Sequence, residues 1–147
     1  MTLLLVRHAV AVRRRDWAGP DDLRPLAPRG YRQADALSES LASYAVERIL
    51  SSPYVRCIET VQPLAARLGL PVEAVAELAE GSGRAITGRG GLAGSVVLCT
   101  HGDVVPELLA ALASKSLPDD GDPPCAKAST WVVDMASAEA SYFPPPA

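Results

Sequence analysis

The chain has 147 residues and a formal net charge of −3, with 48% hydrophobic and 21% charged residues. This length predicts a single domain over residues 1–147 with a substantial core, and the charge argues against a nucleic-acid polymer or an anionic membrane as partner. The three cysteines are odd in number and widely spaced, which argues against a disulfide framework or a zinc site and favours reduced thiols in a cytoplasmic protein.

The first part of the chain predicts a strand, a long loop and a helix. Residues 2–7 form a continuous apolar run, typical of a strand covered on both faces. Arg7 ends this run too early for a signal peptide or a membrane span. Residues 9–27 are rich in Arg, Asp, Gly and Pro and predict a loop. Pro28 is typical of a first helical residue, and apolar residues follow at helical spacing, namely Ala34, Leu37, Leu41 and Tyr44.

Residues 46–52 predict a second strand, and the helix after it has both of its ends marked. Ser52 followed by Pro53 is typical of an N-cap and a first helical residue, and Gly69 is typical of a helix C-terminus. The helix side expected to face the core contains Val55, Ile58, Val61, Ala65 and Leu68.

The second half of the chain continues this alternation. Its expected elements are a weak strand (70–75), an irregular glycine-rich segment (81–94), a strong buried strand (95–101), a helix containing Val104, Leu108 and Leu112, a loop (116–128) and two late strands (129–135 and 140–143). Alternating strands and helices predict an α/β fold, a three-layer sandwich in which helices cover both faces of a mostly parallel sheet.

Polar residues with phosphate chemistry follow three of the expected strands. They are Arg7 and His8 after the first, Ser51, Ser52 and Arg56 after the second, and His101, Gly102 and Asp103 after the strand 95–101. Taken singly, each has an ordinary structural explanation, such as a solvated arginine or a hydrogen-bonding histidine. Because ligands bind beyond the carboxyl ends of parallel strands, we expect the three groups to form one site.

This set of side chains suits phosphoryl transfer. Two guanidiniums bind phosphoryl oxygens bidentately, and a neutral imidazole attacks phosphorus to form a phosphohistidine. A second imidazole donates a hydrogen bond to an equatorial oxygen, and the helix start near Gly102 adds backbone N–H groups that face an anion. We expect that no metal or other cofactor is needed.

The same residues carry a family resemblance over almost the whole chain. The stretches "LLLVRHA", "SSPYVRCIET" and "LCTHGDVV" resemble the R-H-G signature, the S-P-x-x-R-x-x-x-T segment and the second-histidine segment of the histidine phosphatase superfamily, with Ala9 in the glycine position. "RPLAPRGYRQA" resembles the L-x-x-x-G-x-x-Q-A helix entry of that family. The resemblance implies a phosphoglycerate-mutase-like fold, with His8 as nucleophile, Arg7 and Arg56 as phosphate clamps and His101 as the second histidine.

Two subgroups of the family are similar to this chain. The short length and the R-H-A form resemble SixA-type phosphohistidine phosphatases, and the tail from "THGDVVPELL" to "KASTW" is similar to the phosphatase-like domain that follows a Nudix domain in some bacterial nucleotide hydrolases. The chain has no Nudix segment, so we expect a free-standing relative. The resemblance implies a phosphohistidine protein or a small phosphate ester or nucleotide as substrate.

The identity of a general acid separates these substrates. Larger members of the family use a Glu in an L-x-E setting, which Glu80 fits, with Glu77 as its near neighbour; the alternative for Glu80 is a solvated loop residue. An alkoxide leaving group needs a proton, whereas imidazole, with a pKa of about 6.5, needs one far less. A working Glu80 therefore favours phosphate esters or nucleotides.

Cations in two loops are further candidates for contact with the substrate. Residues 13–15 form an arginine run that is either a rim for polyanionic substrates or a solvated loop, and Lys127 is a weaker candidate for a phosphate contact.

Two other functions compete with a phosphatase. A non-catalytic phosphate-binding relative is the main alternative, because residues 81–94 could block the pocket. A metal hydrolase built on His8, His101 and a carboxylate is the second, and the adjacent arginines disfavour it by repelling a cation.

Overall fold

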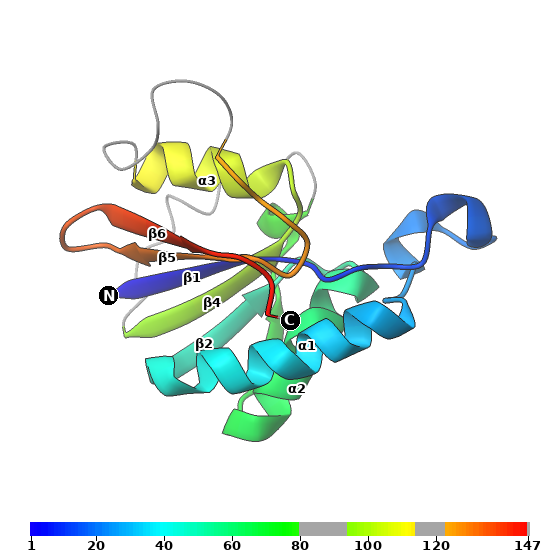
Figure 1. The fold of residues 1–147 in the computed structure, drawn as a ribbon, viewed down its shortest axis with the longest axis horizontal. Coiled ribbons are helices and arrows are strands. Elements are labelled where there is room, and N and C mark those ends of the chain that lie inside the picture. The colour runs from blue at the N-terminus through cyan, green and yellow to red at the C-terminus, as the bar shows by residue number, and fades with distance from the viewer. Residues whose placement is uncertain (80–93, 114–122, 147) are drawn as a thin grey trace.

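The computed structural model describes residues 1–79, 94–113 and 123–146 (Figure 1). Six strands form one sheet in the order β3-β2-β4-β1-β5-β6. The strands are β1 (Thr2–Arg7), β2 (Val46–Ser51), β3 (Val72–Ala74), β4 (Ser95–Thr100), β5 (Thr130–Asp134) and β6 (Glu139–Phe143). The strands from β3 to β1 pair in parallel, and β5 pairs antiparallel with β1 and with β6. The expected mostly parallel sheet is confirmed.

Helices cover both faces of this sheet, as the alternation of elements predicted. They are α1 (Pro28–Leu41), α2 (Val55–Leu68) and α3 (Val104–Leu112). Helices α1 and α2 lie together on one face, and α3 lies on the other (Figure 1). In the described part of the chain, no helix combines the length and the apolar character that a membrane span requires.

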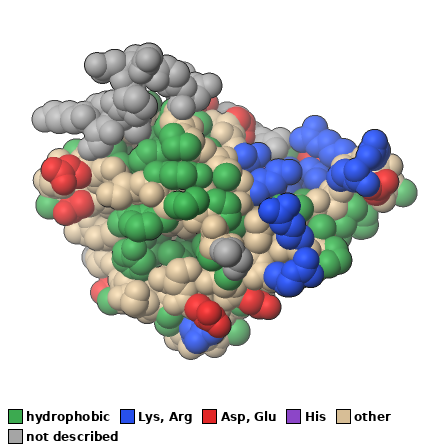
Figure 2. Space-filling model, in the orientation of Figure 1, with side chains coloured by type: hydrophobic (Ala, Val, Ile, Leu, Met, Phe, Trp, Pro, Cys, Tyr) green, Lys and Arg blue, Asp and Glu red, His purple; other side chains and the backbone are tan. Residues whose placement is uncertain are grey.

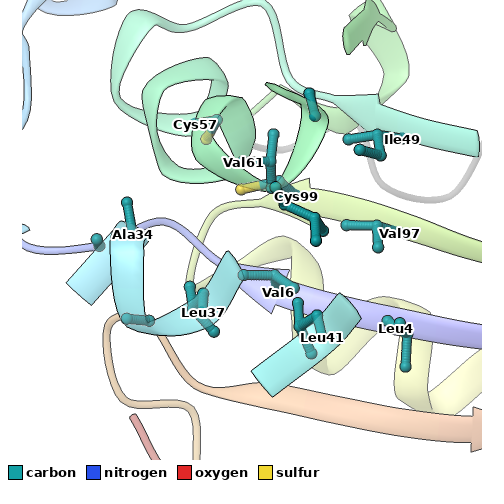
Figure 3. Close-up of a cluster of buried hydrophobic side chains, with 14 of the residues drawn as sticks. Leu4, Val6, Ala34, Leu37, Leu41, Ile49, Cys57, Val61, Val97 and Cys99 are labelled. Carbon is teal, nitrogen blue, oxygen red and sulfur yellow. The ribbon is translucent and has the colours of Figure 1, made fainter. Parts of the chain in front are cut away.

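The apolar run of β1 supplies both core layers. Leu3 and Leu5 belong to the cluster under α3, whereas Leu4 and Val6 belong to the cluster under α1 and α2. Figure 3 shows this second cluster, where Leu37 of α1 lies with the strand residues. Successive side chains of a strand point to opposite faces, so a strand covered on both sides must be apolar throughout. Burying each such side chain contributes about 1.5–3 kcal/mol.

The start of α2 differs from the expected position. The helix begins at Val55 with Tyr54 as its N-cap, and no side chain caps it. The Ser52 amide donates to the Cys99 carbonyl at 2.9 Å and thereby extends the pairing of β2 with β4. Ser52 is therefore held in an extended connection rather than at a helix start, and its hydroxyl serves the site instead.

The buried face of α2 also differs from the expected apolar stripe. Val61 and Ala65 are buried as predicted, but Ile58 is only half-buried while Arg56 and Cys57 are buried. The buried side of α2 thus includes Arg56 and Cys57 in its first turn. The predicted C-terminus at Gly69 is confirmed by its left-handed φ of 68°.

The predicted loop over residues 9–27 is confirmed as mostly irregular, with two short turns of 3-10 helix at Arg14–Asp16 and Asp21–Leu23. A backbone bridge between Ala11 and Leu26 brings its two ends together. Gly30 of α1 lies so close to this segment that a Cβ there would stand 1.9 Å from the Val10 carbonyl oxygen. The helix therefore packs directly on the loop, which returns over the carboxyl ends of the strands.

Candidate functional site

The carboxyl ends of β1, β2 and β4 bring the predicted polar residues together. Because β4 lies between β1 and β2, His101 stands between His8 and Ser52 in sheet order. Backbone hydrogen bonds continue beyond the strands, from the His8 amide to the Thr100 carbonyl at 3.0 Å and from the Ser52 amide to the Cys99 carbonyl. These bonds hold the connections that carry the side chains. We call Arg7, His8, Arg56 and His101 the floor of the site.

The environment of His8 keeps its ring neutral. The side chain is only 6% exposed, and burial, with the charges of Arg56, His101 and Arg7 adding to it, lowers its pKa to about 3, against the opposing effect of a hydrogen bond with Ala9. Nδ1 lies 2.8 Å from the Ala9 carbonyl oxygen, which only accepts. Nδ1 therefore carries the proton and Nε2 keeps a free electron pair.

Ala9, which occupies the family's glycine position, is itself held in place. It is fully buried, and its amide donates to the Thr60 hydroxyl at 2.9 Å. Thr60 donates in turn to the Arg56 carbonyl at 2.6 Å. This chain of bonds links the orientation of His8 to the first turns of α2, and Thr60 is the final position of the quoted S-P-x-x-R-x-x-x-T segment.

His101 is fixed on several sides. Its side chain is 1% exposed, and Nε2 lies 2.9 Å from the Ser52 hydroxyl and 3.6 Å from the Cys57 sulfur. The His8 and His101 rings meet edge to face with centroids 5.5 Å apart. The Tyr54 ring also meets the His101 ring edge to face, with centroids 4.9 Å apart. The two histidines of the chain therefore share one small volume.

Arg7 is anchored at one end of its guanidinium. Nη1 donates to the Cys125 carbonyl at 2.6 Å, and Nε is buried without a hydrogen-bond partner among the described residues. A Cβ on Gly102 would lie 2.8 Å from Arg7 Cζ, so the guanidinium rests against the Gly102 backbone. A buried donor without a partner costs about 1–3 kcal/mol, which an anionic ligand would offset.

Arg56, which could have been a solvated helix residue, is 1% exposed and reaches into the site. Its Nη1 donates to the Asp21 carbonyl at 2.9 Å, and its Nη2 lies 3.3 Å from Asp21 Oδ2. The guanidinium also covers the Tyr54 ring, with Cζ 4.8 Å from the centroid. A buried charge needs such partners.

Asp21 connects several arginines, a role that its sequence context did not predict. Its carboxylate contacts the guanidiniums of Arg24 at 3.0 Å, Arg56 at 3.3 Å and Arg14 at 3.8 Å. Burial is the largest single influence and raises the pKa of this carboxyl, but the Arg24 hydrogen bond and the charges of Arg56, Arg24 and Arg14 together outweigh it and hold the pKa below its ordinary value. Asp21 is thus an exposed residue whose carboxylate takes part in the charge network of the site.

Arg7, His8 and Arg56 of the floor open into a cavity of about 570 Å³, whereas His101 lies beneath it and is not among the described lining residues. Its lining residues are Arg7, His8, Ala11, Arg13, Arg14, Arg24, Arg56, Gly102, Asp103 and Lys127. Lys and Arg side chains gather on the same side of the molecule, near the segment between β1 and α1 (Figures 1 and 2). We call the exposed cations Arg13, Arg14 and Lys127 the rim. The arginine run is therefore partly rim, since Arg15 does not line the cavity.

The two candidates for the general acid, Glu80 and Glu77, are not found at the cavity in the described part of the structure. Glu80 lies outside the described residues, as does nearly all of the segment 81–94. Glu77 lies in a 3-10 turn at Ala76–Leu78 and is not among the described residues that line the cavity. Among the described residues, no three His, Cys, Asp or Glu side chains cluster closely enough to hold a metal ion.

Sequence reasoning missed Arg24 and Cys57. Arg24 is 8% exposed and donates to the Val12 carbonyl at 2.7 Å, yet it falls in a stretch without periodicity. The position of Cys57, directly after Arg56, was the available signal for a residue at the site. In the cluster that it forms with Cys99, burial raises the pKa of the Cys99 thiol well above its ordinary value.

Comparisons with known proteins identify the family of the chain. The model of the histidine phosphatase superfamily (branch 1) matches residues 3–90. The 8-oxo-(d)GTP phosphatase of Mycolicibacterium smegmatis (strain ATCC 700084 / mc(2)155) is 33% identical over 156 residues, which cover 99% of this chain and 48% of that protein. The chain thus spans about half the length of this relative.

Solved structures show the same fold. The protein histidine phosphatase SixA complexed with tungstate matches with a TM-score of 0.73 and 24% identity, over 97% of this chain and 94% of that one. A protein of Nakamurella multipartitia assigned as the phosphohistidine phosphatase SixA matches with a TM-score of 0.76 and 25% identity, over 99% and 96% of the two chains.

Proposed function

Because the chain belongs to the histidine phosphatase superfamily, branch 1, we propose that it is a phosphatase that forms a phosphohistidine on His8 and needs no cofactor. The observation that carries the proposal is the state of His8. Its neutral ring has the proton on Nδ1, so the electron pair of Nε2 is available, and the ring lies beside His101, with which it shares the floor.

The reaction has two steps. The Nε2 electron pair of His8 attacks phosphorus, and the bond to the leaving oxygen breaks, so that its electron pair departs with the leaving group. Water then attacks the phosphohistidine, and the N–P bond breaks with its electron pair returning to Nε2. The proton that water loses passes to solvent. Splitting the displacement in this way replaces one difficult step by two easier ones.

The other floor residues stabilise charge. Arg7 and Arg56 hold the phosphoryl oxygens, and the buried Nε of Arg7 supplies a donor that has no other partner among the described residues. His101 donates to an equatorial oxygen, and the backbone N–H at Gly102, near the start of α3, adds a further donor. Charge stabilisation by fixed donors is the main contribution a protein makes to phosphoryl transfer.

The substrate is a phosphohistidine protein or a small phosphate ester or nucleotide. The SixA neighbour supports the first class, and the relative named as an 8-oxo-(d)GTP phosphatase supports the second. A turnover screen with a phosphohistidine peptide, nucleoside di- and triphosphates and sugar phosphates decides between them.

Trapping the intermediate tests the mechanism. Denaturation during turnover of p-nitrophenyl phosphate should leave phosphate on His8, in an adduct that is lost in acid and stable in base. His8→Asn should remove the adduct and reduce turnover by at least about 10³-fold. Arg29→Gln, on an exposed residue outside the cavity, should change neither. A His8→Asn protein that keeps substantial turnover would contradict the covalent mechanism.

Two arms of the same experiment test the alternatives. Activity should persist in a chelator, and its collapse would favour a metal hydrolase built on His8 and His101. Binding of phosphate without turnover of any compound in the screen would favour a non-catalytic relative of the same fold.

Glu80 is proposed as the general acid, and its test compares leaving groups. Glu80→Gln should slow hydrolysis of an alkyl phosphate by about 10²–10⁴-fold. It should barely affect p-nitrophenyl phosphate or a phosphohistidine peptide, because their leaving groups need little protonation. Glu77→Gln is the matched control and should be neutral. An equal, weak response of all three substrates to Glu80→Gln would remove Glu80 from the site.

A further inference from the structure

We infer that the cavity is built for a small-molecule diphosphate, whose terminal phosphate reaches His8 while Lys127 and Arg24 bind the second phosphate group. The inference rests on the proposed function, since it assigns the substrate class of that same site. A nucleoside diphosphate is a compound of this class.

The cavity holds more positive charge than one phosphate group needs. Six of its lining residues are Arg or Lys, and Asp103 is the only acidic residue among them in the described part of the chain. Asp21 adds a second carboxylate behind the arginines. With Asp16, which pairs with Arg13 at 3.2 Å, three carboxylates thus face six cations, whereas a phosphate monoester brings about −1.5 to −2 charges. A second phosphate group supplies the additional negative charge.

The size of the cavity agrees with this charge balance. Its volume of about 570 Å³ lies within the range of small-molecule pockets, about 300–1,000 Å³. Arg7, His8 and Arg56 take up only its floor, and the remaining wall carries further cations, so that a ligand extending beyond one phosphate still meets positive charge.

Lys127 is the cation whose charge is least compensated. Among the described residues, no hydrogen bond or ion pair reaches its ammonium group, although it lines the cavity. Burial, followed by the positive charges of Arg7, Arg24 and Arg56, lowers its pKa. Lys127 is therefore within electrostatic reach of the floor, and a bound anion between these cations would relieve their repulsion.

Arg24 contributes a cation in a fixed position. Its side chain is 10% exposed, and it is held by the Val12 carbonyl at 2.7 Å and by Asp21 Oδ1 at 3.0 Å. Because these bonds already order the guanidinium, little side-chain entropy is lost when it binds a phosphate. Arg24 and Lys127 thus combine a rigid cation with an adjustable one.

A diphosphate also suits the chemistry of the floor. The Nε2 electron pair of His8 attacks the terminal phosphorus, and the bond from that phosphorus to the bridging oxygen breaks. The electron pair stays on the bridging oxygen, which becomes a terminal oxygen of the departing monophosphate. A phosphate leaving group is only weakly basic, with a second pKa of about 6, so the charges of Lys127 and Arg24 can stabilise it without a strong proton donor.

Matched substrates and a charge-removing variant test the inference. The kcat/KM for GDP should exceed that for GMP by about tenfold or more, since charged hydrogen bonds contribute about 1.5–3 kcal/mol. Lys127→Gln should lower kcat/KM for GDP by about tenfold, largely through KM, and change p-nitrophenyl phosphate less than about twofold. Arg29→Gln removes a positive charge outside the cavity and should change neither substrate.

A binding arm separates this inference from the proposed function. Methylenediphosphonate should bind about tenfold or more tightly than inorganic phosphate in the wild-type protein, and Lys127→Gln should remove most of that preference. This arm does not require turnover, so it decides the inference even if the protein forms no phosphohistidine.

Three outcomes would overturn the diphosphate assignment. One is equal kcat/KM for GDP and GMP, and another is an equal loss for GDP and p-nitrophenyl phosphate in Lys127→Gln. The third is a preference for a phosphohistidine peptide over GDP, which would make a phosphoprotein the substrate.

Discussion

The floor and the rim of the cavity differ in how their cations are held. Arg56 is 1% exposed and is bound by Asp21 and Tyr54, whereas the side chains of Arg13 and Arg14 are 69% and 72% exposed. Solvent screens the rim charges, and an exposed ion pair such as Arg13–Asp16 contributes at most about 1 kcal/mol. The floor cation Arg56 is therefore fixed in position, whereas the rim cations Arg13 and Arg14 are solvated.

Conservative exchange of the floor arginines should cause a much larger loss of activity than the same exchange on the rim. Arg7→Lys and Arg56→Lys keep the charge but lose the planar fork, so each should lower kcat/KM for p-nitrophenyl phosphate by about 10²–10³-fold. Arg14→Lys on the rim is the matched control and should stay within about twofold of wild type. Near-native rates in both floor variants would show that charge alone matters at the floor.

The free energy of unfolding should decrease in acid because His8 is buried in its neutral form. The folded pKa of about 3 lies below the ordinary value of about 6.5, so below pH 6.5 the unfolded chain binds a proton that the folded protein excludes. Stability from this group is fully present above pH 6.5 and is lost as the pH falls toward 3.

His8→Asn should accordingly make the protein less sensitive to acid. Between pH 7 and pH 4.5, its free energy of unfolding should fall by about 2–3 kcal/mol less than that of wild type. Urea denaturation at the two pH values measures the difference. Parallel losses in the two proteins would mean that His8 is not desolvated as described.

Two glycine variants should separate activity from stability. Gly102→Ala places a Cβ 2.8 Å from Arg7 Cζ, so the guanidinium must move, and we expect an activity loss of about 10–30-fold because misplaced catalytic groups are costly. Its stability should change by less than about 1 kcal/mol, since the displaced atoms end a flexible side chain.

Gly69→Ala is the counterpart on the far end of α2. Gly69 has a φ of 68° and no atom near its Cβ position, so this variant should cost roughly 1–2 kcal/mol of stability through left-handed strain and leave kcat unchanged. Equal activity losses in the two variants would indicate general damage rather than displacement of Arg7.

Among the variants expected to change catalysis, Asp21→Asn should change it least, because Asp21 acts only by positioning the neighbouring arginines. Asp21→Asn keeps the shape but removes the charge that faces Arg24 and Arg56, and we expect a several-fold change in KM with a smaller change in kcat. Measurements at low and high salt check this, since screening should shrink the effect. A large, salt-independent loss of kcat would place Asp21 among the residues of the floor.

Most of the fold could be predicted from local patterns. Continuous apolar runs identified β1 and β4, and helical spacing identified α1 and α3. The start of α2 was misplaced by two residues, because Ser52 and Pro53 satisfy the local rule for a helix start. What overrode that rule was the pairing of β2 with β4 and the bond from Ser52 to His101, neither of which is a local property.

Some residues of the candidate site could likewise be predicted from local sequence patterns, and others could not. His8, His101 and Arg7 could be placed from the sequence because strand ends meet at one edge of a parallel sheet. Arg24 and Asp21 could not, because their loop has no periodicity and is held over the site by contacts between distant segments, such as the bond from Arg56 to the Asp21 carbonyl. A charge in a loop has the same sequence context whether it is solvated or buried.

The sequence by itself thus determined the order of strands and helices, the two core faces and the residue types that end the strands, since these depend on hydrophobic periodicity along the chain. The tertiary structure decided which charges are desolvated. It buried Arg56, lowered the pKa of His8, placed Asp21 among three guanidiniums and left Lys127 without an anionic partner among the described residues. Desolvation depends on what other segments place around a group, and only the folded chain sets those surroundings.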